Sequence, residues 1–299
     1  MSKIVLIQGP TASGKSSLAL SLAQQLNAPI ISADSRQFYR ELNIGTAKPS
    51  KEELDLVQHF FINTHSIHDL SFTSAAFMKA GREKISTLFD QGNRHVIVTG
   101  GSGMFVDALI DGLHDAPSDK KVRQELNEEL NQNGMDSLLL ELKNADPIAF
   151  QEIDIQNPMR VLRALEIIRI SGETLEKIRM KNKNAIAYPY IRFGISRNRS
   201  ELYDRINKRV EQMIEHGLFE EVKNLPLQEN VLLKNTVGYK EWIPYFENGI
   251  SFEDIIEMIQ KNSRNYAKRQ ETWMRRYKDL ILLSPYESKT MLEQIIEHI

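Results

Sequence analysis

The stretch GPTASGKS, residues 9–16, carries the strongest fold signal in this chain. It follows the apolar run KIVLIQ at 3–8 and opens the segment SSLALSLAQQL at 16–26, in which leucines recur at helical spacing. Its glycines, lysine and serine fit the pattern G-x-x-x-x-G-K-[ST] in full, in the strand–loop–helix context that this pattern requires. The sequence therefore predicts a phosphate-binding loop formed by Gly9, Pro10, Thr11, Ala12, Ser13, Gly14, Lys15 and Ser16.

Each part of this loop suits an anion. The glycines let the backbone curl so that successive N–H groups point at one phosphate, and the start of the helix adds partial positive charge. Lys15 supplies a full charge, and Ser16 supplies a hydroxyl that can ligate Mg²⁺. The pattern leaves open whether the phosphate belongs to ATP or to another diphosphate.

Strands and helices alternate through the first part of the chain and again near its end. This alternation predicts a parallel sheet flanked by helices, an α/β fold with a P-loop NTPase-like core. The expected strands are 3–8, 29–34, 95–100, 190–196 and 280–284, the last of which is expected to rejoin the sheet. The expected helices are 16–26, 75–92, one ending at 110, 200–224, 236–247 and 252–279.

A charged, helical segment interrupts this alternation from about residue 116. It contains no convincing strand before YIRFGIS at 190–196. The sequence therefore predicts a helical insertion domain at 116–189 in a core made of 1–115 and 190–299.

Composition limits the class of protein. The chain has 299 residues, of which 26% are charged, and a formal net charge of -2, as in ordinary soluble domains. It has no cysteine, which excludes disulfides and thiolate metal sites and fits a reducing cytosol. No apolar stretch is long enough to cross a bilayer, so we expect a cytoplasmic protein that does not span a membrane. The near-neutral charge does not exclude a nucleic-acid partner, because binding needs only a local basic face.

Asp34 is the carboxylate expected beside the phosphate loop. In an ATPase an acid usually ends a neighbouring strand, but the strand at 95–100 is followed by glycine and serine. Asp34 ends the strand at 29–34, and the carboxyl ends of parallel strands border one crevice. The structural alternative is a turn-forming Asp-Ser pair.

Six segments resemble the bacterial tRNA dimethylallyltransferases, also called tRNA isopentenyltransferases, over nearly the whole chain. They are GPTASGKS at 9–16, ISADSRQFYRELNIGTAKP at 31–49, VTGGSGMFVDALIDGL at 98–113, NPMRVLRALEIIRISG at 157–172, TVGYKEW at 236–242 and YAKRQETWMRRY at 266–277. The resemblance implies transfer of a dimethylallyl group from dimethylallyl diphosphate to N6 of the adenosine at position 37, which is 3′-adjacent to the anticodon in tRNAs that read codons beginning with U. It implies that the loop holds a diphosphate leaving group with Mg²⁺.

The resemblance also implies three catalytic residues. Asp34 would be the general base that accepts a proton from N6. Arg209, in YDRINKR at 203–209, would stabilise the leaving diphosphate, with Ser102 as a hydroxyl partner where the family commonly carries threonine. On the residues alone, Arg209 could be a solvated helix arginine and Ser102 a turn serine.

A basic helix is expected to contact RNA. Between Lys261 and Lys278 seven residues are basic and one, Glu271, is acidic, although a solvated surface helix is the alternative. By resemblance the insertion would contact the anticodon stem, and Tyr239 could stack on a base or pack in the core. The expected tRNA contacts are Asp34, Ser35, Arg36, Gln37, Ser102, Arg123, Met159, Arg160, Val161, Leu162, Arg163, Gly238, Tyr239, Lys240, Lys268, Arg269 and Gln270.

Two other functions remain possible on the sequence. A small-molecule kinase would share the loop, Mg²⁺ and the core, and would turn over ATP without RNA. An RNA-binding module that uses the loop as a nucleotide switch would keep its function without Asp34. His59, His65 and His68 lie close together, but without a second ligand cluster they do not favour a zinc site. We expect a monomer.

Overall fold

The computed structural model describes residues 2–69, 72–114, 116–180, 184–287 and 289–299. The chain forms two compact units, one comprising Met1–Ile110 with Ala187–Ile299 and the other comprising Asp111–Ile186. We call them the α/β unit and the helical unit. The sequence had placed the insertion at 116–189, a few residues from these boundaries.

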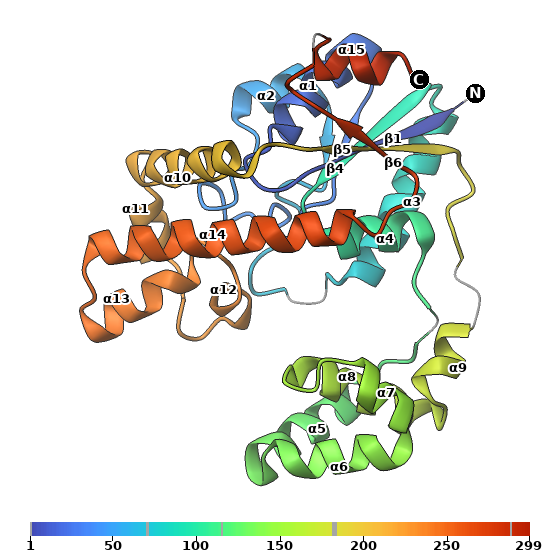
Figure 1. The fold of residues 1–299 in the computed structure, drawn as a ribbon, viewed down its shortest axis with the longest axis vertical. Coiled ribbons are helices and arrows are strands. Elements are labelled where there is room, and N and C mark those ends of the chain that lie inside the picture. The colour runs from blue at the N-terminus through green and yellow to red at the C-terminus, as the bar shows by residue number, and fades with distance from the viewer. Residues whose placement is uncertain (1, 70–71, 115, 181–183, 288) are drawn as a thin grey trace. The chain divides into compact units, whose positions relative to one another are not determined.

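A six-stranded sheet with the order β3-β2-β4-β1-β5-β6 forms the centre of the α/β unit (Figure 1). All of its strand pairs are parallel, as predicted. The strands are β1 (Lys3–Gln8), β2 (Ile30–Ser32), β3 (His59–Phe60), β4 (His95–Gly100), β5 (Tyr190–Ile195) and β6 (Leu280–Leu283). The expectation that the last strand rejoins the sheet is confirmed, because β6 pairs with β5.

Two details of the sheet differ from the prediction. The strand expected at 29–34 ends at Ser32, which leaves Asp34 in the loop beyond the sheet. The two-residue strand β3 was not predicted, because two residues are too few to show a period.

Helices cover both faces of this sheet. Alternate β1 residues Val5 and Ile7 pack in one buried cluster with Leu22 and Ile295, from α1 and α15, while α3 and α4 lie on the opposite side (Figure 1). The helices of this unit are α1 (Lys15–Leu26), α2 (Lys51–Leu56), α3 (Ser74–Asp90), α4 (Gly103–Asp111), α10 (Arg199–Glu215), α11 (Leu218–Lys223), α12 (Val231–Lys234), the 3-10 helix η1 (Lys240–Trp242), α13 (Ile243–Asn248), α14 (Phe252–Met274) and α15 (Met291–Ile296).

Three predicted helices have different limits. The helix expected at 200–224 is divided into α10 and α11 at Gly217, whose φ of 96° is a conformation that glycine adopts readily. The helix expected at 236–247 begins only at Lys240, and the one expected at 252–279 ends at Met274. A second buried cluster, which includes Val210, Tyr239 and Trp242, joins these helices.

In its described residues, the helical unit packs five helices around its own core. They are α5 (Lys120–Asn133), α6 (Met135–Ala145), α7 (Pro147–Glu152), α8 (Pro158–Ser171) and α9 (Leu175–Met180). Leu126, Leu142, Val161 and Leu165 are fully buried there, so this unit has a core separate from that of the sheet.

None of the helices in the described part of the chain combines the length and apolar character that crossing a bilayer requires.

Candidate active site

The phosphate loop joins β1 to α1 in an unusual backbone conformation. Gly14 is the N-cap of α1 with a φ of 100°, and Ala12 has a φ of 62°. No side chain among the described residues caps the helix, so its first N–H groups remain available to an anion. Gly9 is required for packing, because a Cβ there would lie 2.5 Å from the buried Ser13 hydroxyl.

A cavity of about 240 Å³ lies beside this loop. It collects predicted residues from five separate segments of the α/β unit. Those that line it are Thr11, Lys15, Ser16, Asp34, Ser35, Arg36, Gln37, Arg209, Gly238, Arg269 and Gln270. The other loop residues, Gly9, Pro10, Ala12, Ser13 and Gly14, shape the loop beside it.

Lys15, Arg209 and Asp34 interact electrostatically at this cavity. Burial and the charge of Arg209 lower the pKa of Lys15 to about 8, against the opposing effect of Asp34. Burial also lowers the pKa of Arg209, which Asp34 again opposes. Both cations are therefore incompletely solvated, and Asp34 alone balances only part of their charge. A polyanion is the ligand that would stabilise such a pair.

Asp34 is held by a local turn at the same time as it lines the cavity. Its Oδ1 accepts the N–H of Arg36 at 3.0 Å, and its own N–H donates to Ser32 Oγ at 3.4 Å. Asp34 thus forms the turn and lines the cavity as well. The turn fixes the direction of the carboxylate before any ligand binds.

Gln37 lines the cavity, but its amide is already hydrogen-bonded. Its Oε1 accepts from Ser32 Oγ at 3.0 Å, and its Nε2 donates to the carbonyls of Thr46 at 3.3 Å and Ala47 at 3.2 Å. A base edge could bind Gln37 only by exchanging one of these bonds. Its contact with tRNA stays a prediction.

Ser102 hydrogen-bonds to residues that line the cavity. Its Oγ accepts the N–H of Ser35 and donates to the Ser35 hydroxyl, both at 3.0 Å. It also interacts with Tyr266, whose pKa is raised to about 12 by burial and by Asp34, although the hydrogen bond with Ser102 lowers it. Tyr266 also lines the cavity, although the sequence did not predict it as a site residue.

Gln270 links the phosphate loop to the turn after β4. Its Oε1 accepts the N–H of Thr11 at 2.8 Å, and its Nε2 donates to the carbonyl of Gly101 at 2.9 Å. A Cβ at Gly101 would lie 2.2 Å from that Nε2, so the close approach requires glycine. Gln270, predicted as a tRNA contact, thus also fixes the phosphate loop.

Three predicted RNA contacts lie on the surface of the α/β unit. Lys268 and Arg269 are exposed on α14, over the rings of Tyr203 and Tyr266 respectively. Lys240 is partly exposed at the start of η1.

Tyr239 does not offer a surface for stacking. It is completely buried, and its hydroxyl donates to Glu221 Oε1 at 2.6 Å. Stacking on a base is therefore wrong for this conformation, and the alternative of core packing applies.

The remaining predicted RNA residues belong to the helical unit and differ in exposure. Met159 and Arg160 are exposed, whereas Val161 and Leu162 are buried. Side-chain contacts of Val161 and Leu162 with tRNA are therefore corrected to core packing, because they point from α8 into the unit's interior.

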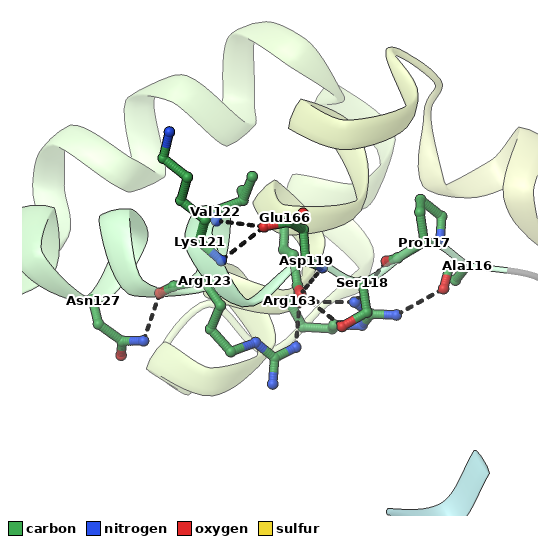
Figure 2. A network of polar contacts seen from close by, with 10 residues as sticks. All are labelled: Ala116, Pro117, Ser118, Asp119, Lys121, Val122, Arg123, Asn127, Arg163 and Glu166. Carbon is green, nitrogen blue, oxygen red and sulfur yellow. Dashed lines mark hydrogen bonds and ion pairs between the residues drawn. The ribbon is translucent and has the colours of Figure 1, made fainter. Parts of the chain in front are cut away.

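Arg123 and Arg163 converge on one buried carboxylate, Glu166 (Figure 2). Arg163 Nη1 lies 2.7 Å from Glu166 Oε2, and Arg123 forms a second ion pair with the same oxygen. Ser118 Oγ donates to the other carboxylate oxygen at 3.0 Å. Burial raises the pKa of Glu166, but these hydrogen bonds outweigh it and hold the pKa below its usual range.

Two of the three neighbouring histidines pair with nearby polar atoms. Among the residues that the structure describes, no group of three His, Cys, Asp or Glu side chains could hold a metal ion. His59 Nδ1 pairs with the carbonyl of Val57 at 2.7 Å, and His65 Nδ1 pairs with the Thr64 hydroxyl at 2.8 Å.

Known proteins place the chain in one family. The model of the IPP transferase family matches residues 37–277. A curated tRNA dimethylallyltransferase of Bacteroides thetaiotaomicron is 37% identical over 296 residues, which cover 99% of this chain and 96% of the relative. The resemblance inferred from the six segments is thereby confirmed.

Solved structures agree with this assignment. The tRNA isopentenylpyrophosphate transferase of Bacillus halodurans has a TM-score of 0.72 at 34% identity, covering 99% of this chain and 95% of that one. A eukaryotic dimethylallyltransferase acting on tRNA has a TM-score of 0.83 at 26% identity, covering 98% of this chain and 75% of that one. The chain therefore belongs to the IPP transferase family, the transferases that its sequence resembles.

Proposed function

We propose that the chain transfers a dimethylallyl group from dimethylallyl diphosphate to N6 of the adenosine at position 37 of tRNA, next to the anticodon. The observation that carries this proposal is the shared cavity of the phosphate loop, Lys15, Arg209 and Asp34. It offers cations for a diphosphate and a carboxylate for an amine within one space. The names of the relatives, tRNA dimethylallyltransferases, support tRNA as the acceptor and a dimethylallyl group as the group transferred.

Asp34 acts on the amine side of this reaction. A bond forms between N6 and C1 of the dimethylallyl group while the bond from C1 to the bridging oxygen of diphosphate breaks. The exocyclic amine is a weak nucleophile because its lone pair is delocalised, so it must lose a proton as it attacks. Asp34 accepts that proton, and the turn that holds its carboxylate orients the amine beforehand.

The loop acts on the leaving side. Negative charge grows on the bridging oxygen, and Lys15, Arg209 and the first N–H groups of α1 stabilise it. Because both cations are poorly solvated without a ligand, they gain more from the diphosphate than solvated cations would.

Mg²⁺ fits this donor set. Ser16 places a hydroxyl at the cavity, and Mg²⁺ usually takes only one or two protein oxygens when phosphate oxygens are present. Ser16 would hold it, and the ion would neutralise part of the diphosphate charge.

The RNA approaches the open side of the cavity. The target base must leave the anticodon stack to reach Asp34. Exposed Lys268 and Arg269 on α14 offer cations to the neighbouring phosphates, and Arg160 offers one on the helical unit. We propose that the substrates are tRNAs that read codons beginning with U, and that the protein acts as a cytoplasmic monomer.

Mass spectrometry of nucleosides tests this function. The protein is incubated with Mg²⁺, dimethylallyl diphosphate and an unmodified anticodon stem-loop that carries three consecutive adenosines. One adenosine should gain a dimethylallyl unit. The Asp34→Asn variant should lose at least about 100-fold in rate, since general-base catalysis contributes roughly 10²–10⁴. Asparagine keeps an acceptor for the Arg36 N–H, so the turn is preserved.

Exposed Asp55 on α2 provides a matched control, and Asp55→Asn should leave the rate unchanged. ATP turnover without RNA and no modified nucleoside would point to the kinase instead. An unchanged rate of transfer in Asp34→Asn would show that Asp34 is not the general base.

A further inference from the structure

Two arginines that were not predicted as site residues contact the phosphate loop through its carbonyl groups. Arg205 on α10 donates from Nε to the carbonyl of Ala12 at 2.8 Å. Arg197, in the segment between β5 and α10, donates from Nε to the carbonyl of Ser13 at 2.7 Å. Within the described part of the chain, neither arginine lines the cavity. They therefore contact the loop from outside the space that the ligand would occupy.

The loop residue held by Arg205 has a backbone conformation that is unfavourable for alanine. Ala12 has a φ of 62°, where an L-residue brings its Cβ too close to the backbone. Such conformations persist only where surrounding contacts impose them, and they gather at functional sites. The Arg205 hydrogen bond to the carbonyl of Ala12 is one such contact. The packing of Ala12 against the buried cluster that includes Leu202 and Ile206 of the same helix is another.

The same contacts set the direction of the neighbouring N–H groups. In a planar trans peptide the C=O and the following N–H point in opposite directions. With the Ala12 carbonyl held by Arg205, the N–H of Ser13 turns the other way and donates to the carbonyl of Pro10 at 3.2 Å, which closes the loop. With the Ser13 carbonyl held by Arg197, the N–H of Gly14 points away from the arginines, as the first of the donors at the start of α1.

Arg197 is itself firmly anchored. Its side chain is 10% exposed and forms an ion pair with Glu201. Glu201 also accepts from the hydroxyl of Tyr286, which in turn accepts the N–H of Asn198 at 2.9 Å. This chain of contacts fixes the guanidinium independently of any ligand in the cavity.

We propose that Arg205 and Arg197 are positioning residues, which hold the phosphate loop in its anion-binding shape without touching the anion. The inference rests on the proposed function only in taking diphosphate as the ligand of the loop. Arg209, in contrast, lines the cavity and acts on the ligand directly.

The test is calorimetric binding of inorganic diphosphate, in the presence of Mg²⁺, to four proteins. These are the wild type, Arg205→Ala, Ala12→Gly and the double variant. Arg205→Ala should weaken binding about tenfold, the scale set by the conformational cost of a left-handed alanine. In the Ala12→Gly background, Arg205→Ala should weaken diphosphate binding by about threefold or less, because glycine adopts the conformation of residue 12 without a stabilising contact.

Two more variants complete the set. Arg197→Ala should weaken binding by a similar factor, and exposed Arg199 at the start of α10 gives the matched control, Arg199→Ala, with unchanged binding. Affinity for the anticodon stem-loop should be unchanged in all of them, which separates an effect on the loop from general unfolding.

An equal loss from Arg205→Ala with and without Ala12→Gly would overturn the proposal, since it would mean that the arginine acts on the anion by its charge. Unchanged binding in Arg205→Ala would also overturn it. Because the calorimetric titration with diphosphate contains neither prenyl donor nor RNA, a failure of the transferase assay leaves its result intact, and the two proposals can fail separately.

Discussion

Two groups of cations in this chain, one in each unit, differ in how their charge is balanced. In the helical unit, Arg123 and Arg163 surround one buried carboxylate and their charges are compensated within the unit (Figure 2). In the α/β unit, Lys15 and Arg209 share a cavity with Asp34, and the pKa of each cation is lowered. Removing one partner of a buried, compensated pair destabilises a fold, whereas cations only partly balanced in a cavity indicate a place for a ligand.

The largest effect should come from removing an uncompensated cation. Lys15→Ala should reduce the rate of transfer about 10³-fold, because one donor to the developing charge of the leaving group is lost. The thermal stability of this variant should equal or slightly exceed that of the wild type, because the substitution removes a poorly solvated cation. Enzyme kinetics measures the rate of transfer, and thermal unfolding measures the stability. Lys223→Ala, at an exposed lysine, is the control for both measurements. A marked loss of stability in Lys15→Ala would show instead that the charge of Lys15 is balanced within the folded protein.

A smaller effect, confined to the other unit, should come from the compensated carboxylate. Glu166→Gln should destabilise the helical unit by about 1–3 kcal/mol, because charged hydrogen bonds are lost. The cost stays moderate since the side chains of Arg123 and Arg163 are 45% and 35% exposed and can be hydrated again. Amide exchange in α8 should speed up, whereas exchange in β1 should not.

The pKa of Glu166 also predicts how the stability of the helical unit changes with pH. The folded-state pKa of Glu166 lies below its unfolded value, so its contribution is present above the unfolded pKa and is lost as the pH falls through the folded pKa. The helical unit of the wild type should therefore lose protection on acidification below about pH 4.5, and Glu166→Gln should lose less. Equal acid sensitivity in both proteins would remove Glu166 as its cause.

The smallest effect should come from Tyr239. Tyr239→Phe removes the hydrogen bond to Glu221 and should cost about 1 kcal/mol of stability. Affinity for the anticodon stem-loop should stay the same, because the ring is buried. Weaker RNA binding at unchanged stability would instead return Tyr239 to the tRNA-contact residues.

Features carried by contiguous residues were predictable. The loop at 9–16, the strand before it and the helix after it all lie within residues 3–26, and their chemistry follows from local backbone geometry. The sheet could be expected because its strands alternate with helices. Helix limits were less certain, since Gly217 breaks a helix that its apolar period would have continued.

Local patterns were enough to predict the phosphate loop, the parallel α/β core, the helical insertion and the identity of Asp34 as the nearby carboxylate. Three other features depend on long-range packing. Gln270 accepts a hydrogen bond from the N–H of Thr11, Tyr266 lines the cavity, and Tyr239 is buried in the core. Helical spacing assigns a residue to a face, but what that face meets depends on segments far along the chain. Gln270 and Thr11 are 259 positions apart, and only the packing of α14 against the sheet's carboxyl edge brings them together.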